Sequence, residues 1–243
     1  MDTKLVRIDK FISNTGITSR RGIRKFLKNN IVTLNGIRIT DPALKCNPLI
    51  DKVLIDENQI KPTEFEYYLL NKPIGIVSTT SDEMGRTDVT SFIDTYSKIY
   101  PIGRLDKDTH GLLLLTNDGK MTHKLIHPKY HIPKTYIVTT KNKPNKSQLT
   151  ELSSGVLLDD GITLPAKVSV ISLHKNITQL KIVLYEGRNR QIRRMCAKLA
   201  LDLIDLKRIA FGPIKLGNTP VGKWRKLTKS EVEHLRNLFN IDK

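Results

Sequence analysis

In the first sixty residues, apolar side chains recur first with the spacing of two helices and then at every second position. Apolar side chains three and four residues apart predict a short helix ending near Gly16. Ser19 is a favourable N-cap for a second helix that reaches about residue 29. The apolar positions expected to pack together are Ile8, Phe11, Ile12, Ile23, Phe26 and Leu27.

An alternating segment follows at residues 31–39 and has Asn35-Gly36 at its centre. Asn-Gly between alternating stretches is the strongest short-range signal of a β-hairpin. A further strand is expected at 53–55, and the polar stretch 58–66 with Pro62 is typical of a linker. We therefore expect a small αα-β domain over residues 1–62 and a second domain over residues 63–243.

The longer second part mixes strand and helix patterns. Strands are predicted at residues 67–70, 75–78, 112–116, 135–138 and 179–185. Helices are predicted at residues 91–96, 120–126, 147–152, 190–199 and 230–239. A small αα-β domain followed by a larger mixed α/β domain corresponds to the α+β fold class.

Positive charge dominates the composition and points to a polyanionic partner. The chain has 41 Lys and Arg against 24 Asp and Glu, a net charge of +17. The second predicted helix and the turn before it carry five cations and no acid, which repel one another unless an anion approaches. A solvated basic surface is the alternative interpretation. The expected RNA-binding residues are Arg20, Arg21, Arg24, Lys25 and Lys28.

Several classes of protein are disfavoured by the sequence. No apolar run approaches the length of a membrane helix, and the first residues lack a secretory signal, so we expect a cytoplasmic monomer. Cys46 and Cys196 are too few for a disulfide framework or a four-cysteine zinc site. His123, His127 and His131 recur every four residues, but Pro128 interrupts the helix, so no metal is expected there.

The most informative segment is 103–119, a polar loop that leads into the apolar run 112–115. Loops at strand ends are where rigid scaffolds hold reactive groups. Asp106 lies in this loop, and by position alone a turn or helix-capping aspartate is the more common interpretation. The segment as a whole closely resembles the signature of the pseudouridine synthases, in particular the bacterial ribosomal-RNA branch that carries an N-terminal S4-type RNA-binding domain.

The resemblance extends over nearly the whole chain. Segments similar to the other family motifs occur in order at residues 71–78, 134–136, 186–196 and 222–228. Segments similar to the S4-type domain occur at residues 7–12, 19–21 and 32–36. The resemblance implies an S4-type domain followed by a pseudouridine synthase domain built on a mainly antiparallel sheet.

The resemblance also implies a site and a reaction. Asp106 would be the nucleophile, Arg193 would pair with it, and Tyr136 would stack on the target base. The residues expected to bind substrate are Arg104, Ile192, Arg190 and Lys72. The implied reaction converts a uridine of ribosomal RNA, more in the manner of the large-subunit enzymes, into pseudouridine without cofactor or metal.

Alternative functions differ in testable features. A non-catalytic ribosome assembly factor would bind ribosomal RNA or an assembling subunit through the same scaffold. It would be expected to have lost Asp106 or Arg193, and both are present. A small-subunit ribosomal-RNA pseudouridine synthase would share the motifs and differ only in substrate. An RNA nuclease or metal-dependent transferase would require clustered carboxylates and a divalent ion.

Overall fold

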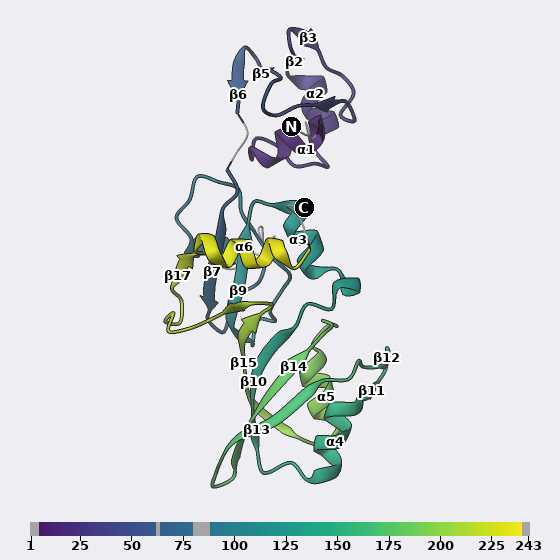
Figure 1. The fold of residues 1–243 in the computed structure, drawn as a ribbon, viewed down its shortest axis with the longest axis vertical. Helices are drawn as coiled ribbons and strands as arrows, with labels where there is room; N and C mark the ends of the chain where they lie inside the picture. Colours follow the sequence, from purple (N-terminus) through teal and green to yellow (C-terminus); the bar gives the residue numbers. More distant parts are fainter. Residues whose placement is uncertain (1–4, 62–63, 80–87, 240–243) are drawn as a thin grey trace. The chain divides into compact units, whose positions relative to one another are not determined.

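The computed structural model describes residues 5–61, 64–79 and 88–239 (Figure 1). The chain divides into two compact units, of which the first comprises Met1–Glu66 with Thr95–Ile99 and the second Tyr67–Asp94 with Tyr100–Lys243. The domain boundary expected between residues 62 and 63 lies outside the described residues. Each unit is considered separately below.

The first unit is built from two short helices and small antiparallel sheets. Its helices are α1 (Ile8–Asn14) and α2 (Ile23–Asn29). Strands β3 (Ile37–Arg38), β2 (Val32–Leu34), β5 (Val53–Ile55) and β6 (Asn58–Ile60) form one sheet in that order, and β1 (Val6–Arg7) pairs with β4 (Lys45–Cys46). One apolar cluster, which includes Ile8, Ile12, Ile23 and Leu27, joins the helices to the sheet.

Local geometry in this unit agrees with part of the sequence pattern. The predicted hairpin is confirmed, because Asn35 and Gly36 adopt φ values of 52° and 84° between β2 and β3. The predicted start of the second helix is wrong. Ser19 Oγ accepts a hydrogen bond from the Gly22 backbone N–H at 3.1 Å, so Ser19 closes a turn and the helix begins only at Ile23.

The second unit is organised around a nine-stranded sheet. Its main path is β13 (Lys167–His174), β14 (Ile177–Leu184), β10 (Lys134–Lys141), β15 (Asp202–Phe211), β9 (His110–Thr116), β7 (Tyr67–Lys72) and β17 (Trp224–Lys226). Strand β16 (Ile214–Lys215) pairs with β15, and β8 (Tyr100–Pro101) pairs with β9. These named strands pair antiparallel except for β9 and β15, which are parallel, so the expected mainly antiparallel sheet is confirmed.

Two groups of helices lie at the two ends of this sheet (Figure 1), and each packs in its own apolar cluster. Helices α4 (Lys146–Ser154) and α5 (Gln191–Lys198) pack against β10, β13, β14 and β15. Helices α3 (Gly119–Ile126) and α6 (Lys229–Asn237) pack against β7 and β9. The short β11 (Leu157–Leu158) and β12 (Gly161–Ile162) form a separate hairpin after α4. The run Leu112–Leu115 of β9 is buried, and Leu112 and Leu114 pack in the cluster that includes α3 and α6.

Two of the predicted elements are wrong in this unit. Residues 75–78 form a turn and an isolated bridge instead of a strand, because Gly75 at φ 91° turns the chain and donates its N–H to the Lys107 carbonyl. The helix predicted at 91–96 is a short 3₁₀ turn, η1 (Val89–Phe92), which the Asp88 side chain caps. A second 3₁₀ turn, η2 (Pro128–Tyr130), follows α3.

Candidate active site

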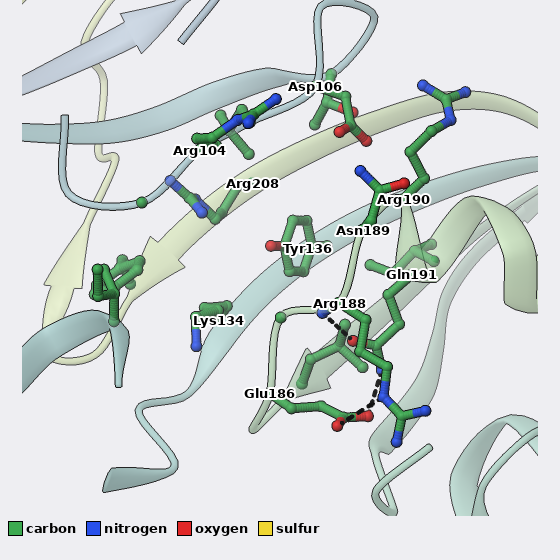
Figure 2. A pocket seen from close by; sticks show the side chains of 18 of the residues that line it. Arg104, Asp106, Lys134, Tyr136, Glu186, Arg188, Asn189, Arg190, Gln191 and Arg208 are labelled. Carbon is green, nitrogen blue, oxygen red and sulfur yellow. Dashed lines mark hydrogen bonds and ion pairs between the residues drawn. The ribbon is translucent and has the colours of Figure 1, made fainter. Parts of the chain in front are cut away.

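A cavity of about 380 Å³ lies in the second unit, next to β10 and β15 (Figure 2). Its walls come from the loop 103–109, the segment 126–132, the start of β10, the loop 185–190 with the start of α5, and the end of β15. A volume of this size is within the range of small-ligand pockets. The cavity therefore has room for a small organic ligand.

Asp106 lies in the loop between β8 and β9, and its half-buried side chain lines the cavity. Hydrogen bonds hold the backbone around it. The Asp106 carbonyl accepts from the Thr109 N–H at 3.1 Å, and Ser78 Oγ both donates to the Leu105 carbonyl and accepts from the Leu105 N–H. Among the described residues, no hydrogen bond or ion pair reaches the Asp106 carboxylate. The loop is fixed and its carboxylate is open.

Lys72, which is expected to bind substrate, contacts the backbone of the same loop. The residue is fully buried, and its Nζ donates to the carbonyls of Asp106 at 3.1 Å, Thr109 at 2.8 Å and Pro73 at 2.9 Å. Burial lowers the pKa of Lys72 to about 8, and the charge of Asp106 opposes that shift. Lys72 does not line the cavity, so in this structure its ammonium group positions the loop.

Arg193 contacts the loop at a different residue from the one expected. In the described part of the chain its ion pair is with Asp108, at 3.3 Å between Nη1 and Oδ2, and not with Asp106. Its Nη2 also donates to the Asp108 carbonyl at 2.8 Å and to Thr109 Oγ1 at 3.2 Å. Because α5 carries Arg193, these contacts fasten the loop to the helix two residues beyond Asp106.

Asp108 is a site residue that the sequence analysis missed. Arg190 donates to both of its carboxylate oxygens at 3.1 Å, a bidentate arrangement. Partial burial raises the pKa of Asp108, but the hydrogen bonds from Arg190 and the charge of Arg193 outweigh it and lower that pKa below its usual value. In the sequence, the only indication that Asp108 belongs to the site is that it is an acidic residue two positions after Asp106.

Tyr136 and Ile192 provide the flat and apolar surfaces of the cavity. Tyr136 is a half-buried residue of β10, and Figure 2 shows its ring near the centre of the cavity. Ile192 is a buried residue of α5 that also lines the cavity. Arg104 is exposed and belongs to the same wall as Asp106. These three residues and Asp106 are brought together as the sequence predicts.

The cavity also has cations beyond those expected to bind substrate, among them Arg208 and Lys134. Arg208 is 2% exposed, and its Nε donates to the Leu112 carbonyl at 2.7 Å. Lys134 lies at the start of β10, where burial and the charge of Arg208 lower its pKa to about 8, and Glu186 partly offsets them. Arg208 lies next to Tyr136 because β15 pairs with β10, although the two residues are more than seventy positions apart in the sequence. Only the pairing register of these strands could have identified Arg208 as a cavity residue.

The cations of the first unit lie at its surface. All five residues expected to bind RNA are exposed: Arg20, Arg21, Arg24, Lys25 and Lys28. Arg20 is 3.8 Å from the carboxylate of Asp9, which also pairs with Arg7 at 2.9 Å. The charge of Arg20 is therefore partly balanced, whereas the ion pairs formed by the described residues include none from the other four.

Metal and membrane features were also examined over the described ranges. There, no three His, Cys, Asp or Glu side chains gather closely enough to hold a metal ion. Each helix in those ranges is too short or too polar to span a lipid bilayer.

A basic surface on one unit and a cavity with a carboxylate, an aromatic ring and several cations on the other define an enzyme that acts on nucleic acid. The family model described as RNA pseudouridylate synthase matches residues 66–198, and that of the S4 domain matches residues 6–48. The chain belongs to the RNA pseudouridylate synthase family and carries an S4 domain.

Individual relatives agree over almost the full length. The chain is 40% identical over 240 residues to ribosomal large subunit pseudouridine synthase B of Bacillus subtilis, covering 98% of both chains. It is 35% identical to the dual-specificity RNA pseudouridine synthase RluF of Escherichia coli, covering 96% of this chain and 79% of the relative. A crystal structure of a pseudouridylate synthase matches with a TM-score of 0.67 and 32% identity, covering 95% of this chain and 99% of that one.

Proposed function

We propose that this enzyme converts a uridine of large-subunit ribosomal RNA into pseudouridine, with Asp106 as the nucleophile. The observation that carries the proposal is the open carboxylate of Asp106 in a cavity that also holds the ring of Tyr136. Its backbone is fixed by Thr109, Ser78 and Lys72, so the carboxylate needs little reorganisation before it meets a substrate.

The cavity suits a base that has left its helix. A uracil inside structured RNA must be extruded before an enzyme can reach it, and an extruded base is stabilised by stacking on an aromatic ring. Tyr136 offers that ring and Ile192 an apolar wall. Arg104, which is exposed at the cavity, has the charge and position to contact the RNA backbone.

The proposed chemistry is an isomerisation. Asp106 attacks the nucleotide, either at the ribose C1′ or on the uracil ring, and the bond between N1 and C1′ breaks. The base rotates while the cavity holds it, and a bond forms between C5 and C1′. The bond between the nucleotide and Asp106 breaks and frees the carboxylate, C5 loses its proton and N1 gains one. The atoms balance without an oxidant, reductant or energy source. Arg193 and Arg190 keep the loop in place through Asp108.

Ribosomal RNA as the substrate is supported by two features. Four of the exposed cations of the S4 domain form no ion pair with the described residues and can neutralise phosphates. The Bacillus subtilis relative, which is named for the large ribosomal subunit, aligns over 98% of this chain. The large-subunit RNA is therefore the first substrate to test.

Tritium release from RNA labelled at C5 of uridine tests the reaction directly, because C5 loses its hydrogen. Large- and small-subunit RNA would be purified from a strain that lacks the gene and incubated with the wild-type enzyme or Asp106→Asn. We expect release from large-subunit RNA by the wild type and loss of release by at least about 10³-fold in the variant, since a missing nucleophile removes the chemical step.

Asp202→Asn is the matched control, because Asp202 is an exposed aspartate at the start of β15. It should retain wild-type release, and gel electrophoresis should show RNA of unchanged length. Substantial activity of Asp106→Asn would refute the assignment of the nucleophile. Shortened RNA without tritium release would favour a nuclease, and tight binding with neither product would favour an assembly factor.

A further inference from the structure

From the geometry of Arg208 we infer that it is a substrate-binding residue whose guanidinium group donates to a carbonyl oxygen of the extruded uracil. This inference rests on the proposed function. Arg208 lines the cavity but is 2% exposed, and its Nη2 is buried without a hydrogen-bond partner among the described residues. A buried charged donor without an acceptor is destabilising, and a ligand oxygen would relieve that cost.

Strand pairing places Arg208 beside the proposed stacking surface. Tyr136 on β10 and Arg208 on β15 are register partners, so their side chains share one face of the sheet (Figure 2). The register shifts between Thr135 and Tyr136, an irregularity that re-aims side chains next to a site. A base stacked on the ring of Tyr136 would therefore present an edge toward the guanidinium group.

The same part of the cavity carries a second cation. Lys134 lies two residues before Tyr136 on β10 and lines the cavity, so it shares the face of the sheet. Its Nζ donates to the Ile132 carbonyl at 3.0 Å, and burial together with the nearby charge of Arg208 lowers the pKa of Lys134. Within the described ranges Arg208 has no ion-pair partner, so this region favours a ligand atom that carries partial or developing negative charge.

A uracil carbonyl fits this position better than a phosphate does. A phosphodiester continues into the RNA chain on both sides and needs an open groove, whereas Arg208 is almost fully buried. Arg104 and Arg190 are the exposed cations of the cavity and suit phosphates. The edge of the uracil ring carries carbonyl oxygens, and these gain negative charge when the N1–C1′ bond breaks. A guanidinium donor at that edge would bind the ring and stabilise this charge.

A chemical double-mutant cycle tests the contact. The target uridine would first be mapped in the RNA that the wild type modifies. A short RNA that contains it would then carry uridine, 2-thiouridine or 4-thiouridine at that site, or a neutral methylphosphonate beside it. Single-turnover rates would be measured for the wild type and Arg208→Gln. We expect sulfur at the contacted oxygen to slow the wild type about 10- to 100-fold, the range of a hydrogen bond to a charged group, and to slow Arg208→Gln less than about 2-fold further.

Two more variants separate binding from folding. Lys134→Gln keeps Arg208 and should retain most of the sensitivity to sulfur. Lys215→Gln, which removes an exposed cation on β16, should behave as the wild type does. If Arg208→Gln does not fold, Arg208→Lys replaces it, because lysine keeps the charge but loses the planar donors. A reduced sulfur penalty with an unchanged methylphosphonate penalty supports the inference.

Other outcomes overturn it. A sulfur penalty that is the same in every Arg208 variant means that no contact with the base exists. Coupling to the methylphosphonate instead would assign Arg208 to a phosphate. Loss of folding in both Arg208 variants, with no sulfur penalty in the wild type, would leave only a structural role through the Leu112 carbonyl. The rate of the wild type on RNA with unmodified uridine is measured first. Failure of the wild type to act on this RNA would refute the proposed function itself.

Discussion

Replacement of Gly111 by alanine should destabilise the second unit by disturbing the junction between β9 and β15. Gly111 has a φ of 102°, which L side chains rarely adopt, and it pairs with Arg208 across the parallel contact between the two strands. A Cβ atom at this position would overlap the Arg208 carbonyl oxygen and would lie 2.8 Å from the Arg208 nitrogen. Both atoms belong to a backbone that strand pairing holds, so neither can move freely.

The magnitude follows from two contributions. A non-glycine residue at positive φ costs about 1–2 kcal/mol. An overpacked contact with a rigid neighbour costs about 1–3 kcal/mol more. The free energy of unfolding should therefore fall by about 2–5 kcal/mol, which lowers the melting temperature by roughly 4–20 °C for a domain of this size. Turnover should fall as well, because the overlap displaces Arg208 from Tyr136.

Differential scanning calorimetry of the full chain measures this effect, with Gly217→Ala as the matched control. Gly217 also has a positive φ, 59°, but a Cβ there would meet no described atom within 4 Å. The control should therefore lose only about 1–2 kcal/mol. Equal melting temperatures for the two variants would show that the overlap with Arg208 is relieved without cost, and the argument from close packing would be refuted.

Two further predictions concern charge. Lys134 has a pKa of about 8 and is charged below it, so tritium release should decline between pH 7 and 9. Lys134→Arg should move that decline to higher pH, because a guanidinium group stays protonated, and an unmoved pH profile would rule Lys134 out. Arg24 and Lys28 are exposed on α2, and replacing both by glutamine should reduce the log–log salt slope of RNA binding by about 1.4–1.8, measured by fluorescence anisotropy. An unchanged slope would remove these two residues from the RNA contact.

The sequence predicted best where one local pattern decides the structure. The apolar run of β9 and the Asn35-Gly36 hairpin were expected because burial and turn geometry leave few alternatives. Strand β13 was missed because its apolar alternation is interrupted at Ile171, where the register with β14 shifts. Strand β15 was missed because it carries charges on a partly buried strand, among them Arg208.

In the candidate site, too, residues marked by a local motif were predicted and residues placed by tertiary contacts were not. Asp106, Tyr136 and Ile192 were found through the motifs and are brought to one cavity. The contacts among charged groups were not predictable, since they depend on ångström-scale choices between neighbouring partners. Arg193 illustrates this point, because its expected partner and its observed partner are separated by one residue. Lys72 was assigned to the substrate because its sequence neighbours suggest it, whereas only burial identifies its role beneath the loop.

The arrangement of two aspartates on one loop explains how a carboxylate remains open among so many arginines. Asp108 accepts hydrogen bonds from both terminal nitrogens of Arg190 and pairs with Arg193, so it engages one guanidinium group of α5 and one of the loop before it. If Arg193 were paired with Asp106 before RNA binds, that ion pair would have to open before attack. Because both arginines pair with Asp108, they anchor the loop that carries Asp106. Among the described residues, none forms a hydrogen bond or ion pair with the carboxylate oxygens of Asp106. In the proposed mechanism, the charge that fixes the loop and the charge that reacts are thus carried by different residues.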